Sequence, residues 1–331
     1  MPLAVNTSLA RKATAKQNMA PFGYGHIFGC VFGGNVVYYV EITFWKGGDP
    51  LTVDLHIHTC ISDGSDTPAE LLCKVKAAGI DCFSVTDHDA VKGAEILRPL
   101  LGEGDPLFIP GAEFSCREGK DKYHILGYGF DPAAPSVTEL VRRGHDMRME
   151  KVLARLDFLA NAFGFTFPKH EIDALTALDN PGKPHIGNLM VKYGYTENRK
   201  QAIRDYIDRM HFSNDAYLKP REAIEAIRAA GGIPVLAHPF FGSGDELILG
   251  DEMEERLRLL MDWGLEGIEV YYSGFTEKLR AEALALAQRY GLYATAGSDY
   301  HGANKLVQLG DTGLSEGALP APVARFMEVF A

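Results

Sequence analysis

Two histidines in a short predicted strand are the first residues whose types and spacing could bind a metal. Residues 53–64 read VDLHIHTCISDG, and the alternation of apolar and polar residues predicts a β-strand with His56 and His58 on one face. Asp63 follows in a turn, so its carboxylate can fold back toward both imidazoles. Imidazole and carboxylate together suit Zn²⁺, Mn²⁺ or Fe²⁺. An H-x-H pair can equally be ordinary surface or core structure, so the motif needs partners elsewhere.

Further acids and histidines stand at or beside the ends of other predicted strands, in the segments TDHD, GAE, YHILGY, AHP and GSDYH. In parallel α/β barrels the carboxyl ends of the strands form the face on which active sites are assembled. Each residue alone could be a structural histidine or a helix cap, but burying all of them together without a metal would be costly. The candidate ligands are His56, His58, Asp63, His88, Glu113, His124, His238, Asp299 and His301. They exceed the needs of one metal ion and suit two or three, with Glu113 as a candidate bridge.

The elements that would position these residues alternate along the chain. Strands are predicted at 53–58, 81–86, 107–112, 123–129, 233–238, 267–272 and 293–297. Helices are predicted at 67–78, 219–230, 251–263 and 275–290. Alternating strands and helices indicate an α/β fold with a mainly parallel sheet, and this number of strands favours a barrel over an open sheet.

Two segments break the alternation. Residues 137–215 carry apolar residues at helical spacing, which predicts a helical insertion that serves as a lid or substrate-recognition cap, or as a structural subdomain. Residues 1–50 are rich in glycine and aromatic residues and form an N-terminal extension of unknown role, either flexible or a hairpin laid against the main domain. The barrel itself is assigned to residues 51–136 and 216–331.

Composition limits the functions that the chain can have. It has 331 residues, 46% hydrophobic and 23% charged, with a formal net charge of −11, which argues against an extended nucleic-acid or membrane surface. Five cysteines with no C-x-x-C pair are typical of reduced thiols, and no apolar run reaches the roughly 18 residues of a membrane span. We therefore expect a cytoplasmic protein, and nothing in the composition indicates an obligate protein partner.

The ordered motifs DLHIHTCISDG, TDHD, GAE, HILGY, AHP and GSDYH resemble those of the PHP (polymerase and histidinol phosphatase) family over roughly residues 51–310. The chain is most similar to PHP phosphoesterases that act on nucleotides, including nucleoside 3′,5′-bisphosphate phosphatases and 5′-3′ exoribonucleases, which also carry a helical insertion after the HILGY strand. The resemblance implies a distorted (β/α)7 TIM-like barrel with two or three divalent metal ions, Mn²⁺ first and Zn²⁺ or Fe²⁺ as alternatives.

The resemblance also distributes the ligands among the metal ions. One ion would take His56, His58, Glu113 and Asp299, a second would take Glu113, His124 and His238, and a third would take Asp63, His88 and His301. Family members differ in how fully they fill the third site.

The insertion contains GKPHIGNLM at residues 182–190, where similar proteins have Arg-x-His reaching the substrate phosphate. Here Lys183 replaces the arginine and His185 remains. Lysine keeps the positive charge but loses the bidentate geometry. Arg148 is either a second basic contact or part of a solvated helix face.

The resemblance implies a metal-dependent phosphoesterase that hydrolyses a phosphate ester of a small nucleotide or an oligonucleotide end. A hydroxide bridging two metal ions about 4 Å apart would attack the phosphorus. Protonation of the leaving group could fall to a metal-bound water, Asp87 or His185, so no general acid is assigned, and Cys60 has no evident activating partner. A histidinol-phosphate-type phosphomonoesterase and a non-catalytic, metal-stabilised PHP module are the alternatives.

Overall fold

The computed structural model describes residues 18–19, 24–33, 36–45, 51–210, 217–242, 246–315 and 319–331. Before residue 51, β2 (Tyr24–Gly33) and β3 (Val36–Trp45) pair antiparallel, and β1 (Asn18–Met19) pairs with β2. In the part of the chain that the structure describes, no helix is both long and apolar enough to cross a membrane.

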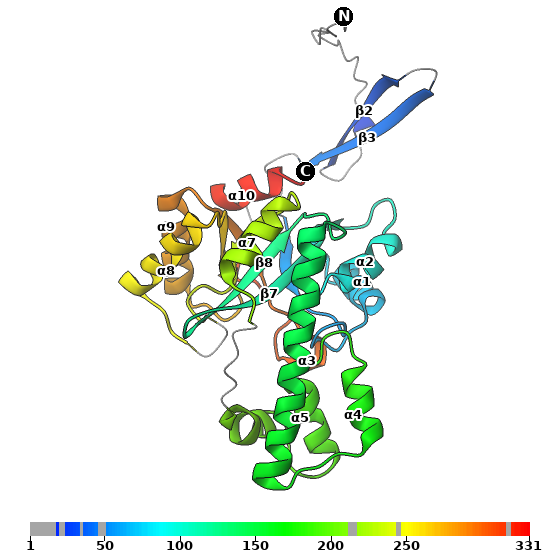
Figure 1. The fold of residues 1–331 in the computed structure, drawn as a ribbon. Helices are drawn as coiled ribbons and strands as arrows, with labels where there is room; N and C mark the ends of the chain where they lie inside the picture. Colours follow the sequence, from blue (N-terminus) through cyan, green and yellow to red (C-terminus); the bar gives the residue numbers. More distant parts are fainter. Residues whose placement is uncertain are drawn as a thin grey trace, which may run out of the picture.

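The rest of the described chain forms a body of two sheets, with a lobe of helices below it (Figure 1). One sheet contains β4 (Val53–Ile57), β5 (Cys82–Val85) and β6 (Leu107–Phe108) in parallel. The other has the order β11-β10-β9-β8-β7, formed by β7 (Gly111–Glu118), β8 (Asp121–Tyr128), β9 (Ile233–Leu236), β10 (Gly267–Tyr272) and β11 (Tyr293–Gly297). The body is therefore a mixed α/β fold.

Two expectations about the strands are wrong. The predicted strand at 107–112 is two strands, β6 and β7, interrupted at Pro110, which has no N–H to donate to a ladder. The sheet is also less parallel than predicted, because β8 runs antiparallel to both β7 and β9. The reversal follows from the short turn between Glu118 and Asp121, where Gly119 adopts a φ of +58° that favours glycine.

Helices cover the outside of the body. They are α1 (Pro68–Ala77), α2 (Lys92–Leu97), α7 (Pro220–Ala229), α8 (Gly250–Asp262), α9 (Glu277–Tyr290) and α10 (Ala321–Glu328). Of these, α2 and α10 were not predicted from the sequence. At the start of α1, Thr67 and Glu70 bond each other's backbone N–H in a capping box, and α9 ends at Gly291 with a φ of +66°. These local signals explain why the four predicted helices of the body lie within two residues of those observed.

Large apolar side chains fill the space between the sheets and the helices. Phe114, Tyr128 and Phe326 are fully buried in this core. The hydroxyl of Tyr128, on β8, donates a hydrogen bond to the backbone oxygen of Leu55, on β4, at 3.0 Å. This bond links the two sheets at Leu55, the residue that precedes His56.

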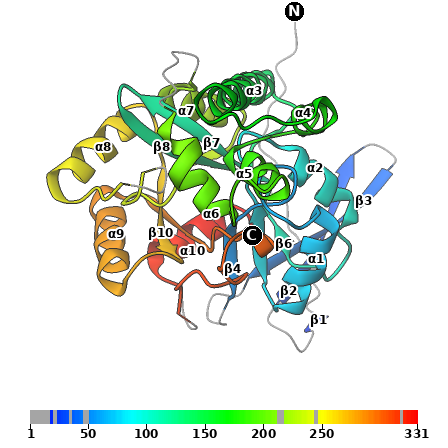
Figure 2. The ribbon, with the colours of Figure 1, turned by 90° about the horizontal axis from the view of Figure 1, so that it is seen from below.

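The lower lobe consists of α3 (Pro135–Phe163), α4 (Lys169–Thr176), α5 (Lys183–Lys192) and α6 (Arg199–Gln201), which we call the insertion helices. α3 runs from the body down into the lobe, and the insertion helices lie across the lower end of the body (Figures 1 and 2). Arg199 bonds Asn304 of the body, and Lys92 pairs with Asp179 of the lobe at 2.6 Å.

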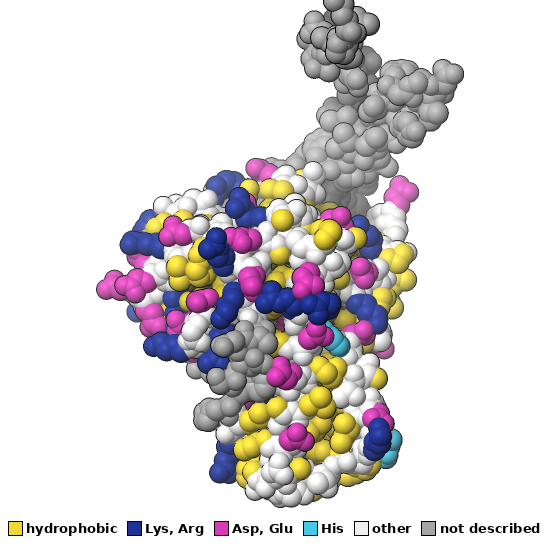
Figure 3. All heavy atoms as spheres, in the orientation of Figure 1, with side chains coloured by type: hydrophobic (Ala, Val, Ile, Leu, Met, Phe, Trp, Pro, Cys, Tyr) yellow, Lys and Arg dark blue, Asp and Glu magenta, His cyan; other side chains and the backbone are white. Residues whose placement is uncertain are grey.

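The surface shown in Figure 3 differs between the two parts. Basic and acidic side chains are interspersed over the body, whereas hydrophobic side chains gather over the lobe. This mixture of charges on the body is what 33 basic and 44 acidic residues, with no long run of one sign, predict.

Candidate metal centre

The structure brings all nine candidate residues together at one end of the body, and Glu113 lies at their centre. Its Oε2 atom is 3.2 Å from the Nε2 atoms of His56 and His58 and 3.0 Å from His88 Nδ1. Its Oε1 atom is 2.8 Å from His124 Nδ1 and 3.2 Å from His238 Nε2. One buried carboxylate therefore faces five imidazoles, as a bridging ligand would.

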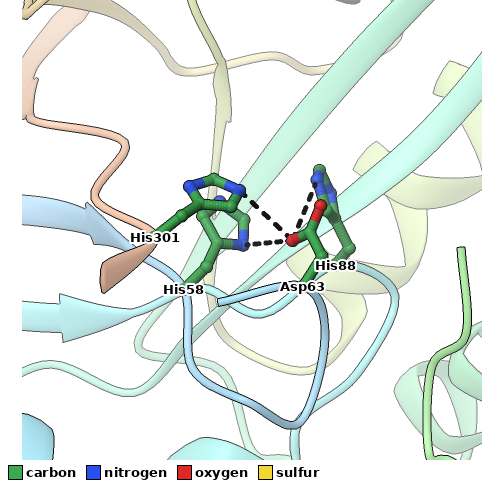
Figure 4. A group of neighbouring side chains, drawn as sticks. All are labelled: His58, Asp63, His88 and His301. Carbon is green, nitrogen blue, oxygen red and sulfur yellow. Dashed lines mark ion pairs between the residues drawn. The ribbon is translucent and has the colours of Figure 1, made fainter. Parts of the chain in front are cut away.

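Three groups within the cluster have ligand atoms close enough to hold one ion each. They are His58, Asp63, His88 and His301; His56, His58 and Asp299; and His88, Glu113 and His124. In the first group Asp63 Oδ1 is 3.2 Å from His301 Nε2, and the imidazoles of His58 and His88 point toward the same oxygen (Figure 4). His58 belongs to two groups because its two ring nitrogens face opposite ways.

The loop that carries Asp63 is organised by Asp87. The carboxylate of Asp87 accepts hydrogen bonds from the backbone N–H and hydroxyl of Thr59 and from the hydroxyl of Ser62, at 2.7–2.8 Å. Gly64 closes the loop, and a Cβ atom there would lie 2.3 Å from the backbone oxygen of His58, so only glycine fits. Asp87 thus positions a candidate ligand, and its oxygens are occupied in doing so.

The residues fit divalent metal ions. Among the described residues, four buried side-chain atoms that face one another in this cluster make no well-aligned hydrogen bond: His56 Nε2, His58 Nε2, Asp63 Oδ1 and His88 Nδ1. A buried polar atom without a partner is costly, and a cation would satisfy these together. Imidazole nitrogens mixed with carboxylate oxygens suit Mn²⁺, Fe²⁺ or Zn²⁺.

The electrostatics of the cluster also call for positive charge. Burial lowers the pKa of His58, but the close contacts of its ring with the carboxylates of Asp299 and Glu113 outweigh burial and raise this pKa to about 9. Burial raises the pKa of Glu113, but the surrounding imidazoles outweigh it and hold this pKa well below its usual range. In the absence of metal, protons would supply the charge that a metal ion otherwise brings.

A second set of residues orients the candidate ligands, and the sequence did not identify it. Glu269 is fully buried on β10; its Oε1 lies 2.9 Å from His56 Nδ1, and its Oε2 accepts a hydrogen bond from the backbone of His238 at 2.8 Å. Tyr272 and Lys305 bond Asp299 Oδ2 at 2.9 and 2.7 Å, which leaves Oδ1 facing His56 and His58. The alternation in GIEVYY, which places Glu269 on the face opposite Ile268, was the available signal.

The backbone is strained at this end of the body. Among the described residues other than glycine, only Asp89, His238 and Asp299 have positive φ angles, of 47°, 27° and 59°. Such angles are uncommon for residues with a Cβ atom and cluster at functional sites. Two of the three are candidate ligands, and the third follows His88.

The residues predicted to bind substrate lie on the insertion helices. Arg148 reaches the centre: its Nε bonds Asp89 at 2.6 Å and its Nη2 bonds Ser115 at 2.8 Å. Lys183 pairs with Asp208 at 2.5 Å. The third predicted substrate-binding residue, His185, lies near the start of α5. Its Nδ1 atom accepts a hydrogen bond from the backbone N–H of Gly182, and burial lowers the pKa of the imidazole.

Comparison with known proteins identifies the family. No family model matches the sequence. The chain is 31% identical over 261 residues to a 3′,5′-nucleoside bisphosphate phosphatase of Chromobacterium violaceum, covering 75% of this chain and 87% of that protein. It is 28% identical over 263 residues to a 5′-3′ exoribonuclease of Haemophilus influenzae, covering 78% of this chain and 92% of the relative.

The fold agrees with these relatives. A chain from Bifidobacterium adolescentis, described as a metal-dependent phosphoesterase, superposes with a TM-score of 0.71 at 24% identity, over 85% of this chain and 96% of the other. Together with the ordered motifs and the metal-binding geometry, the relatives define a class. The chain belongs to the PHP family of phosphoesterases, hydrolases that act on phosphoester bonds.

Proposed function

We propose that this protein hydrolyses a phosphate ester of a small nucleotide or of an oligonucleotide end, using two or three divalent metal ions. The observation that carries the proposal is the convergence of nine candidate ligands around one buried carboxylate, Glu113. The substrate class is supported by the two relatives, one named for nucleoside bisphosphates and the other for RNA ends.

The proposed distribution of metal ligands is the one that the family resemblance implies, and each of the three groups shares at least two residues with one of its sites. Glu113 would bind two ions. One of them would also take His56, His58 and Asp299, and the other would also take His124 and His238. Asp63, His88 and His301 would hold the third ion. Mn²⁺ is the proposed metal, with Zn²⁺ or Fe²⁺ as alternatives. Bound divalent ions lower the pKa of water and polarise phosphoryl oxygens.

The chain's own residues would bind and orient the substrate. Arg148 places a guanidinium beside Ser115 and Asp89, next to His88, where it can contact a phosphate oxygen. His185 is the proposed neutral contact from α5, and its lowered pKa keeps the imidazole uncharged near neutral pH. Lys183 would reach the phosphate by exchanging Asp208 for it, since both side chains are partly exposed.

We also propose that the two sheets form the distorted (β/α)7 barrel of the family, with residues 137–215 as a cap. Two isolated bridges support closure: Ile57 pairs with Tyr300, beyond β11, and His88 pairs with Glu113, on β7. Backbone hydrogen bonds accompany them, from His58 N to Tyr300 O at 2.9 Å and from Glu113 N to Asp87 O at 3.2 Å. These contacts connect the three-stranded sheet to both edges of the five-stranded one.

A substrate screen tests the proposed function. The purified protein, loaded with Mn²⁺, is assayed for phosphate release from nucleoside 3′,5′-bisphosphates, 5′-phosphorylated oligonucleotides and histidinol phosphate. We expect release from the nucleotide substrates. Preference for histidinol phosphate would contradict the substrate class, and no release from any substrate with metal bound would leave only the non-catalytic module. His58→Ala should lose metal and activity together.

A further inference from the structure

Two positively charged side chains on α3 have no carboxylate partner of their own among the residues that the structure describes. Lys151 and Arg155 are four residues apart and lie on one face of the helix, in line with Arg148. Lys151 is half-buried, and Arg155 is only 9% exposed, beside the apolar residues Val152 and Leu156 of the lobe's core. Arg155 is therefore not part of a solvated helix face.

The charges around this pair are mostly positive. Among the described residues, the largest positive charges acting on Lys151 are those of Arg155, Arg148 and Lys183, and the largest negative one is Asp89, which Arg148 already pairs at 2.6 Å. Burial, followed by these cations, holds the pKa of Lys151 well below its usual range.

The partners nearest to the pair do not neutralise it. The carboxylate that acts on Arg155 is Asp208, which Lys183 already pairs. The ring centre of Tyr217 lies 4.5 Å from Lys151 Nζ in a cation–π contact, which stabilises an ammonium group without removing its charge. Among the residues that the structure describes, no ion pair compensates Lys151 or Arg155, although buried charges are normally paired.

We propose that Lys151 and Arg155 form a subsite for a second phosphate group of the substrate. The inference rests on the proposed function, which places the scissile phosphate at the metal centre. Arg148 contacts the residues beside His88, and at 1.5 Å of rise per residue Lys151 and Arg155 follow roughly 4.5 and 10 Å further along α3. A nucleotide with phosphates at two positions, or two successive nucleotides of a strand, spans such a distance. The enzyme would therefore select substrates with two phosphate groups.

The test compares substrates that differ only in the second phosphate. The ratio of kcat/KM for a nucleoside 3′,5′-bisphosphate to kcat/KM for the matching monophosphate is measured for wild type and for the double variant Lys151→Met, Arg155→Met. Each substitution keeps an unbranched chain and removes the charge. We expect the ratio to fall by roughly 100-fold, on the order of tenfold for each charge-assisted contact.

A matched control lies on the same helix. Arg142→Met removes a cation of α3 that is 59% exposed and already paired with Glu139 and Asp146, so it should leave the ratio unchanged. If the double variant does not fold, Lys151→Met alone gives the same test, because this side chain is only half-buried. A loss of kcat/KM by the same factor on both substrates would overturn the proposal.

A binding measurement separates this proposal from the proposed function. If the wild-type holoenzyme releases phosphate from no substrate, the proposed function fails, but the subsite can still be tested by titrating the metal-loaded protein with a nucleoside 3′,5′-bisphosphate in a calorimeter. Weaker binding by the double variant than by Arg142→Met supports the subsite. Equal binding by the two variants refutes it.

Discussion

Among the residues other than the nine candidate ligands, Glu269 is the one whose replacement should affect the metal centre most directly. Its carboxylate is buried. Glu269→Gln keeps the shape of the side chain and removes its charge. The carboxylate serves two partners, His56 Nδ1 at 2.9 Å and the backbone N–H of His238 at 2.8 Å. A glutamine has one carbonyl oxygen, so it can accept from one partner and must turn its own N–H groups toward the other.

The size of the effect follows from these two contacts. A hydrogen bond to a charged group contributes about 1.5–3 kcal/mol, and both partners here are buried. Replacing a residue that orients a metal-bound histidine typically lowers metal affinity by 10- to 100-fold, which corresponds to about 1.4–2.8 kcal/mol. The two figures agree, so we expect metal affinity to fall by roughly 10- to 100-fold.

Chelator competition measures this change in the variant and the wild type without relying on activity. Glu266→Gln is the matched control, because Glu266 lies just before the same strand, is 39% exposed and pairs with Arg228 at the surface. Excess metal should restore the activity of Glu269→Gln if the residue only orients His56. Metal affinity within twofold of wild type would refute the inferred role of Glu269.

Three further outcomes are expected. In the chelated protein the pKa of His58 is about 9, against an ordinary value of 6.5. The stability that its protonated form contributes, roughly 3 kcal/mol, is therefore complete below pH 6.5 and is lost as the pH rises through 9. Thermal unfolding measured against pH should show this loss in wild type and not in His58→Gln. Asp87→Asn should lower stability by about 1–3 kcal/mol, because Thr59 and Ser62 lose acceptor oxygens, and should leave the pH–rate profile unchanged; loss of its alkaline limb would instead indicate a general acid. Arg199→Ala removes the bonds to Asn304 and should raise KM more than it lowers kcat, whereas unchanged kinetics would show that the lobe needs no such anchor.

A residue of the centre could be predicted from the sequence only where its type and its place in a short motif indicate metal binding. The nine candidate ligands lie in short motifs such as HIHTCISDG, so residue type and order were sufficient to select them. Glu269 and Tyr272 contact their ligands from a strand that is distant in sequence, and Lys305 reaches Asp299 from the loop six residues further along the chain. Each alone is an ordinary strand or loop residue, and only the fold shows what it bonds.

The fold divides in the same way between local and non-local causes. Helices such as α1 could be predicted because their caps and their apolar spacing lie within the helix or next to it. Strand direction is decided by pairing between distant segments, and the alternation of apolar and polar residues is the same in parallel and antiparallel strands. The alternation therefore predicts the strand that contains His124, but the expectation of a mainly parallel sheet does not hold for it.

That direction explains how His124 comes to share a centre with His238. β8 runs opposite to β9, and Ile125 pairs with Leu236, the last residue of β9, so the first residues of β8 project beyond the end of β9. The hairpin of β7 and β8 extends in the same direction, with Glu113 opposite Leu126 near its base. A residue early in β8 thus lies level with one just after β9. The rule that active-site residues follow parallel strands holds for His238 and does not apply to His124, whose place depends on the hairpin reversing the chain.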